Sequence, residues 1–154
     1  MRRIPTISLC LTSLTFVASS LVAKKPNILF IAVDDLKPTF GAYSNAVPTP
    51  SIDRIAARGT TFLNAHCQQA VCGPSRASVM TGKYPDYTQI WDLKTKIRAI
   101  HPEIVTLAQH FKNNGYHTSG VGKIFDPRSV DKGADTRSWS EAYTQTWHLK
   151  YNEK

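Results

Sequence analysis

The apolar segment at residues 26–33 restricts the possible folds more than any other part of the chain. Its sequence, Pro-Asn-Ile-Leu-Phe-Ile-Ala-Val, carries no charge and does not alternate between polar and apolar residues. A run of this kind, rich in β-branched residues, is typical of a strand buried on both faces of a parallel sheet. Because helices must then cover both faces of that sheet, the segment predicts an α/β fold.

Two adjacent acids, Asp34 and Asp35, follow this segment directly. Carboxylates at the end of a buried strand are costly unless something binds them. Open α/β sheets also place their ligand sites outside the carboxyl ends of their strands. We therefore expect Asp34 and Asp35 to bind a metal ion. The alternative is a solvated turn, in which aspartate is common.

Helix and strand patterns alternate further along the chain and indicate right-handed βαβ units. Capping, proline and glycine signals predict helices at residues 49–59, 74–81 and 106–114, and apolar stretches predict strands at residues 60–63 and 116–121. Lys123 follows the last strand, so it should lie at the same edge as the two acids, although a lone lysine is more often a surface charge. Two convincing strands are too few for a stable sheet, and we expect the chain to be the N-terminal part of a longer protein.

Aromatic residues outside these elements are expected to pack on the core. Tyr84, Tyr87 and Trp91 lie in the irregular segment 83–102, where the alternative is the wall of a substrate cleft. A second set recurs every four residues, as on one face of a helix. It comprises Tyr143, Trp147 and Tyr151.

Residues 72–82, Cys-Gly-Pro-Ser-Arg-Ala-Ser-Val-Met-Thr-Gly, carry the clearest chemical signal. Pro74 suits the first turn of a helix, so Cys72 lies at the start of that helix. The helix dipole and free N–H groups favour an anion there, as a nucleophile requires. A disulfide between Cys67 and Cys72 would consume this residue, and we do not expect one.

The first 23 residues have the pattern of a secretory signal peptide. Arg2 and Arg3 precede an apolar stretch, and Ala23 provides a small residue before the cleavage point. The stretch is shorter than the roughly 20 residues of a membrane span, so a retained anchor is the weaker alternative. We expect residues 1–23 to be removed, no stable membrane insertion, and a secreted or periplasmic protein. The net charge of +8 is scattered, which argues against a nucleic-acid partner.

Three motifs together resemble the sulfatase family. The run at residues 72–76, followed by Met-Thr-Gly at 80–82, resembles the signature in which a cysteine is oxidised to Cα-formylglycine. Asp34 and Asp35 resemble the first metal-binding segment of the family, and Lys123 resembles its later lysine motif. The sequences around the cysteine and lysine motifs are most similar to those of iduronate-2-sulfatases and their bacterial relatives. Residues 24–154 are thus identified as the incomplete N-terminal part of a sulfatase catalytic domain.

The resemblance implies an alkaline-phosphatase-like α/β fold, a parallel-sheet sandwich, that hydrolyses sulfate esters of a glycan with Ca²⁺. Asp34, Asp35 and residue 72 would coordinate the calcium ion, which prefers oxygen ligands. A formylglycine-generating or sulfatase-maturing enzyme would convert Cys72, and one hydroxyl of the hydrated aldehyde would attack sulfur. The other hydroxyl would then allow the sulfate to be eliminated. Arg76 would hold the formylglycine, and Lys123 would bind sulfate oxygens.

Two departures from the family pattern affect these expectations. Iduronate-2-sulfatases usually carry a histidine at the position of Asp126, and an aspartate there is expected to repel an anionic substrate. The remaining metal ligands and the acid histidine of the family lie beyond residue 154, so residues 24–154 alone should bind calcium weakly and show no turnover. The alternative functions are a phosphohydrolase of the same superfamily, against which Cys72, Pro74 and Arg76 argue, and a non-catalytic protein that binds sulfated glycans.

Overall fold

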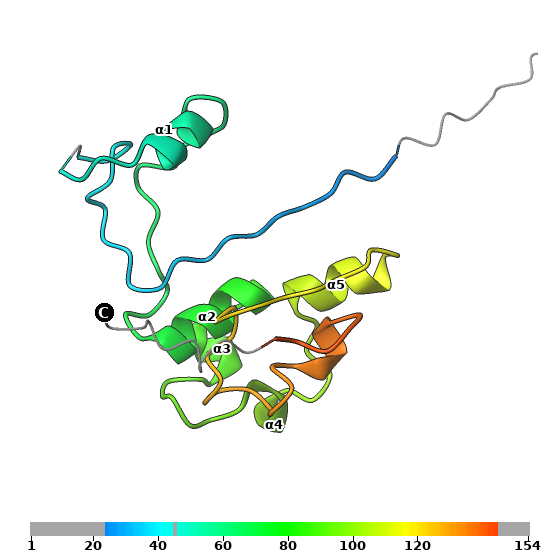
Figure 1. The fold of residues 1–154 in the computed structure, drawn as a ribbon. Coiled ribbons are helices and arrows are strands. Elements are labelled where there is room, and N and C mark those ends of the chain that lie inside the picture. The colour runs from blue at the N-terminus through cyan, green and yellow to red at the C-terminus, as the bar shows by residue number, and fades with distance from the viewer. Residues whose placement is uncertain (1–23, 45, 145–154) are drawn as a thin grey trace, which may run out of the picture. The chain divides into compact units, whose positions relative to one another are not determined.

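The computed structural model describes residues 24–44 and 46–144 (Figure 1). The chain divides into two units, Met1–Phe30 and Ile31–Lys154. Residues 24–30 of the first unit are extended and exposed. The expected signal peptide lies outside the described residues. None of the helices in the described part of the chain has the length and apolar character that crossing a membrane requires.

Short helices make up the regular structure of the second unit. They are α1 (Pro50–Ala56), α2 (Cys72–Thr81), α3 (Pro85–Thr88), α4 (Ile97–Ile100), α5 (Leu107–Asn113) and the 3₁₀ helix η1 (Thr136–Ser138). Helix α2 contacts both α3 and α5, and α5 also contacts η1 (Figure 1). The predictions of α1, α2 and α5 are confirmed, whereas α3 and α4 fall in a segment for which no regular element was expected.

Helix α2 starts two residues earlier than predicted. Val71 is extended, and the helix begins at Cys72, which leaves Pro74 in the first turn, where its missing N–H breaks no helical hydrogen bond. Gly82 ends the helix with a φ of 64°, and its amide donates to the carbonyl of Ser78. The left-handed conformation favours glycine at this position. The apolar and small face of α2 is buried and includes Ala77 and Met80.

The core of the second unit forms where α2 meets the segments on either side of η1. Trp139 is 7% exposed, and its ring lies against Phe125 and Tyr143. Its indole N–H donates to the carbonyl of Ala134 at 2.8 Å, so burying the ring leaves no unpaired donor. The buried hydrophobic residues are Ala77, Met80, Ile90, Ile97, Phe125, Val130, Ala134 and Trp139.

The predicted strands do not form in the described residues, which contain isolated bridges but no regular strand. Residues 26–33 are extended and exposed, and residues 60–63 are exposed as well. A strand needs backbone hydrogen bonds to a neighbouring strand, and among the described residues no backbone–backbone hydrogen bond joins either segment to another. Val121 forms a parallel bridge with Thr144, but it is a single bridge. The expected sheet and sandwich are therefore not seen in this part of the chain.

Two predictions about aromatic residues also need correction. Tyr84, Tyr87 and Trp91 do not cover the core, because they are 69%, 53% and 53% exposed. Tyr143 is not in a helix. The other two members of its expected stripe lie outside the described residues.

Candidate active site

Three predicted metal ligands lie together in the second unit. One ligand atom from each of Asp34, Asp35 and Cys72 lies within 4.8 Å of the other two. The carboxylates come from the turn that follows the extended segment, and Cys72 is the first residue of α2. Asp35 has a φ of 51°, an unusual backbone conformation for a residue with a side chain. The backbone of the turn is therefore strained at Asp35, where the turn brings the two carboxylates close to α2.

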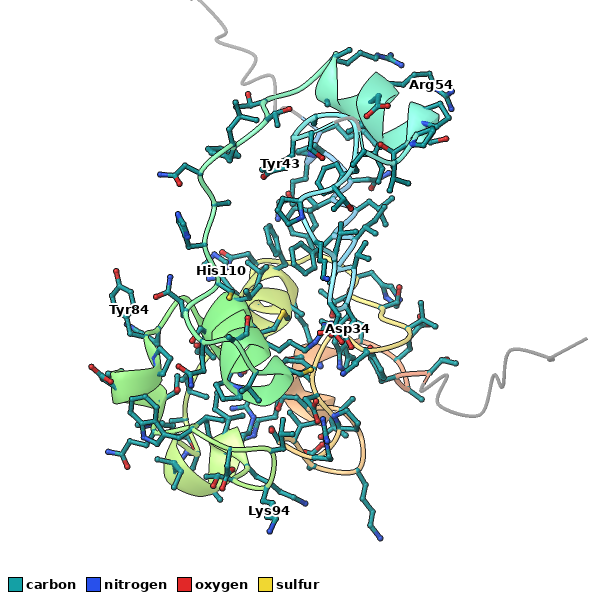
Figure 2. The ribbon with its side chains drawn as sticks, turned by 90° about the vertical axis from the view of Figure 1, so that its left-hand side faces the viewer. Asp34, Tyr43, Arg54, Tyr84, Lys94 and His110 are labelled. Atoms are coloured by element: carbon teal, nitrogen blue, oxygen red, sulfur yellow. The ribbon has the colours of Figure 1, made fainter. Side chains whose placement is uncertain are left out.

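Asp34, which is labelled in Figure 2, receives hydrogen bonds from two cationic side chains. Arg76 Nη2 donates to Oδ1 at 2.8 Å, and Lys123 Nζ donates to Oδ2 at 2.6 Å. These bonds, first that from Arg76 and then that from Lys123, lower the pKa of Asp34 below the ordinary aspartate value. The carboxylate is thus charged throughout the neutral range and well into acid.

Arg76 also connects α2 to the segment that carries Lys123. Its Nη1 donates to the carbonyl of Ile124 at 3.2 Å and to the carbonyl of Lys123. The side chain is only 11% exposed, so these bonds are shielded from water. We expected Arg76 to hold residue 72, but its hydrogen bonds go to Asp34 and to these two carbonyls. Its contacts are those of a residue that fixes the relative position of three segments.

Lys123 lies between the acidic turn and the start of α2. Burial alone would lower the pKa of Lys123, but hydrogen bonds with Asp34 and Cys72 outweigh it and raise the pKa above the ordinary value. The ammonium group is therefore protonated and directed at the predicted metal ligands. Lys123 therefore lies beside Asp34, although no regular strand precedes it.

Tyr143 anchors the loop around Lys123. Its hydroxyl donates to the carbonyl of Gly122 at 2.9 Å and accepts from the amide of Ile124 at 3.1 Å. Gly122 has a φ of 83°, which favours glycine at the turn before the lysine. A Cβ at Gly120 would lie 2.6 Å from the Tyr143 ring, so this glycine allows the ring to approach. The sequence offered no signal for this anchoring role.

Asp126 does not face the site as a bare charge. It is 1% exposed, and Arg128 binds both its oxygens through Nε and Nη2, each at 2.9 Å. Burial raises the pKa of Asp126, but the hydrogen bonds from Arg128 outweigh it and place the pKa below the ordinary value. The carboxylate is charged and paired, so the expected repulsion of an anionic substrate is largely cancelled.

The cluster of Asp34, Asp35 and Cys72 fits part of a calcium site. Calcium–oxygen distances are about 2.3–2.6 Å, so one ion can reach ligand atoms that lie within 4.8 Å of one another. Calcium takes six to eight oxygens, and three residues supply only part of that number. A thiol sulfur suits softer metals, so an oxygen at residue 72 would complete this set better than the cysteine itself. Both cysteines of the described chain, Cys67 and Cys72, are free.

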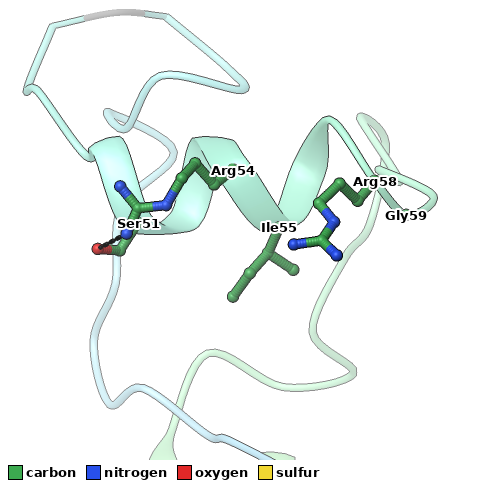
Figure 3. Close-up of a pocket in the computed structure, with 5 residues that line it drawn as sticks. All are labelled: Ser51, Arg54, Ile55, Arg58 and Gly59. Carbon is green, nitrogen blue, oxygen red and sulfur yellow. Dashed lines mark hydrogen bonds between the residues drawn. The ribbon is translucent and has the colours of Figure 1, made fainter.

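An open hollow of about 470 Å³ lies elsewhere, along α1 (Figure 3). Arg54 donates to Ser51 at 3.1 Å on its wall. No carboxylate, thiol or imidazole lines this hollow, so it offers neither a nucleophile nor metal ligands. Its lining residues are Ser51, Arg54, Ile55, Arg58 and Gly59.

The profile of the Sulfatase family matches this chain over residues 26–153. The chain belongs to the sulfatase family. It is 44% identical over 117 residues to the iduronate 2-sulfatase of Mus musculus, which covers 74% of this chain and 21% of that protein. A sulfatase of Formosa agariphila is 45% identical over 115 residues, covering 70% of this chain and 23% of that protein. An ulvan-active sulfatase of the same species is 38% identical over 107 residues, covering 68% of this chain and 21% of that protein.

These comparisons confirm the resemblance inferred from the sequence motifs. Family membership implies an α/β fold of the alkaline-phosphatase type. The chain spans about a fifth of the length of the curated relatives that it matches. The described part of this sulfatase chain therefore contains helices and a candidate site, but not the sheet that the fold implies.

Proposed function

We propose that the protein hydrolyses sulfate esters at the site around Cys72. One observation carries the proposal. The ligand atoms of Asp34, Asp35 and Cys72 lie within 4.8 Å of one another, and two cations bind Asp34, in a chain of the sulfatase family. Carboxylates beside a protonated lysine suit a metal-assisted reaction on an anionic ester.

Each residue of the site has a distinct role in this proposal. Asp34 and Asp35 hold calcium, which supplies positive charge that favours a deprotonated nucleophile and stabilises the charged oxygens of the sulfate. Residue 72 provides the oxygen nucleophile after a sulfatase-maturing enzyme has converted Cys72 to formylglycine. Lys123 binds a sulfate oxygen through its ammonium group. Arg76 keeps Asp34 and the Lys123 segment in position.

The proposed substrate is a sulfated glycan, as for an enzyme similar to iduronate-2-sulfatases. Two matched relatives are named iduronate 2-sulfatase and ulvan-active sulfatase, which supports a carbohydrate substrate. The signal-peptide pattern supports a secreted or periplasmic enzyme. A mature N-terminus at Lys24 in the exported protein would support that location, whereas retention of Met1 in the cytoplasm would contradict it.

We also propose that residues 26–33 enter the parallel sheet of a sandwich in the whole protein. Leu29 and Ile31 are 83% and 69% exposed, and water is an unfavourable environment for such a continuous apolar run. Burial gains about 25 cal/mol per Å² of apolar surface, which favours a covered strand. Amide hydrogens of residues 28–33 should exchange slowly in the whole protein. Exchange at the rate of an unfolded peptide would contradict the proposal.

The test of activity uses the whole protein that carries this sequence, produced together with a sulfatase-maturing enzyme. We expect calcium-dependent hydrolysis of 4-nitrophenyl sulfate, with loss of activity after chelation. The peptide containing residue 72 should show the mass loss of thiol-to-aldehyde conversion. Lys123→Ala should lower kcat/KM by about 100-fold or more. Lys94→Ala, an exposed lysine outside the site, serves as the control.

Three results would contradict this function. An intact thiol at residue 72 in a competent host would argue against formylglycine chemistry. Hydrolysis of 4-nitrophenyl phosphate instead of the sulfate would indicate a phosphohydrolase. Binding of sulfated glycans without turnover by the whole protein would indicate a non-catalytic role.

A further inference from the structure

We propose that Arg128 binds a second anionic group of the substrate, and that Asp126 positions it for this task. The inference rests on the proposed function, because it assigns a subsite next to the reacting sulfate. The anionic group would be a carboxylate or another sulfate, both of which match the planar fork of a guanidinium group.

The orientation of Arg128 is tightly defined although its side chain is 51% exposed. Asp126 accepts from Nε, from Nη2 and from the backbone amide of Arg128, at 2.9, 2.9 and 3.0 Å. Most exposed arginines adopt many rotamers, and binding a ligand then costs the entropy of ordering them. Here a buried carboxylate has already ordered the side chain.

Arg128 remains able to donate to a ligand. A guanidinium group has five N–H donors, and Asp126 uses one on Nε and one on Nη2. Within the described parts of the chain, the remaining N–H groups of Arg128 have no acceptor. Because half of the side chain is exposed, these donors are accessible from solvent.

A shared carboxylate connects Arg128 to the reacting part of the site. Asp126 Oδ2 lies 2.9 Å from Arg128 Nη2 and 3.8 Å from Lys123 Nζ. Lys123 in turn binds Asp34 at 2.6 Å. The charge of Asp34 is also close enough to act on Arg128. A substrate whose sulfate reaches Lys123 would therefore bring its neighbouring groups to Arg128.

The charges also favour an anion at this position. Asp126 alone would repel an anion, but Arg128 binds both of its oxygens and neutralises its charge. Asp126 is also buried, whereas the guanidinium is exposed, so a ligand would meet the arginine and not the acid. The exposed face of the pair is cationic.

The test compares substrates that differ only in the second anion, using the whole protein. The first substrate is a monosaccharide whose single charged group is one sulfate, and it is called the neutral substrate because it has no second anion. The second substrate is the same sulfated sugar with a uronate carboxylate. The third is the same sulfated sugar with a second sulfate in place of the carboxylate. Arg128→Gln should lower kcat/KM for whichever anionic substrate the subsite accepts by about tenfold more than for the neutral one, mainly by raising KM. Arg128→Lys should recover only part of the lost kcat/KM, because lysine keeps the positive charge but lacks the planar, two-pronged guanidinium group.

Arg137→Gln provides a matched control. Arg137 is 50% exposed and binds Glu103 and the carbonyl of Pro102, outside the site. This variant should leave the ratio between the substrates unchanged. A larger loss for the uronate identifies a carboxylate subsite, and a larger loss for the disulfated sugar identifies a sulfate subsite.

Equal losses on all three substrates, or none on any, would overturn the proposal for Arg128 while leaving sulfatase activity intact. If the unaltered protein hydrolyses no sulfate, the proposed function fails. Calorimetric binding of the same sugars to wild type and Arg128→Gln then decides the subsite separately. Weaker binding of the anionic sugars alone to the variant would support it, and identical binding would overturn it.

Discussion

Asp34 connects the two cations of the site with the predicted metal ligands. Arg76 and Lys123 each bind one of its oxygens and hold its pKa below the ordinary value of 3.8. A lowered pKa in the folded state means that this stabilisation is fully present above pH 3.8. It is lost as the pH falls from there through the lower folded-state pKa. Because Asp34 is 37% exposed, water screens the pairs, and their contribution to stability is below about 1 kcal/mol.

We therefore expect Asp34→Asn to lower the melting temperature of the whole, calcium-free protein slightly at pH 7. Near pH 3 the difference should shrink, because a protonated Asp34 resembles asparagine in charge. Thermal unfolding at the two pH values in the presence of a chelator measures this. Asp86→Asn, at an exposed aspartate without an ion pair in the described residues, is the control. A difference that grows toward acid pH would contradict the assigned pairing.

At the scale of the elements, helix α2 positions the site through its first turn. A Cβ at Gly73 would lie 2.5 Å from Ser129 Oγ and 2.9 Å from the carbonyl of Asp92. Real Cβ contacts are not this short, so a larger residue would push the start of α2 away from these neighbours. Cys72 is adjacent and would move with it.

Gly73→Ala should therefore destabilise the protein by about 1–3 kcal/mol, as overpacking does, and also reduce sulfate hydrolysis. Gly82→Ala, at the other end of α2, provides the comparison. No atom lies within 4 Å of a Cβ there, and the cost comes only from its φ of 64°. This second variant should lose stability but keep its kcat. Equal effects of both variants on kcat would show that the start of α2 does not position the reacting group.

At the scale of the whole described molecule, a buried polar network joins α4, α5 and η1. Arg98 donates to Asp135 Oδ2 at 2.9 Å, to Gln109 at 2.7 Å and to the carbonyl of Ile104 at 2.7 Å. Asp135 is 1% exposed and also accepts from Ser138. A buried carboxylate of this kind depends on its cationic partner.

Arg98→Met should lower the local stability of α5 and η1 by about 3–5 kcal/mol, because it leaves Asp135 buried and unpaired. Amide hydrogen exchange of these helices in the whole protein measures the change. Arg137→Gln removes a pair with Glu103, which is 88% exposed, and should cost about 1 kcal/mol or less. Comparable losses for the two variants would show that the network does not hold these elements together.

Local signals in the sequence determined the three helices with clear start and stop residues. Pro50 begins α1 and Thr106 caps α5 because of their own chemistry, Pro74 suits the first turn of α2, and Gly82 ends α2. The residues of the site could also be identified from the sequence, because carboxylates, a cysteine and a lysine lie in motifs that resemble those of the family. Strands could not be predicted in this way, because a strand depends on partner strands far along the chain, and the described residues do not supply them.

Only the tertiary structure decided how the site residues meet. The sequence placed Asp34, Cys72 and Lys123 far apart, and their hydrogen bonds depend on the folding of three segments around Arg76. It also suggested that Asp126 repels anions, whereas the structure pairs this acid with Arg128. Residue types set which chemistry is available, but long-range packing sets which charges neutralise one another and which stay open to a ligand.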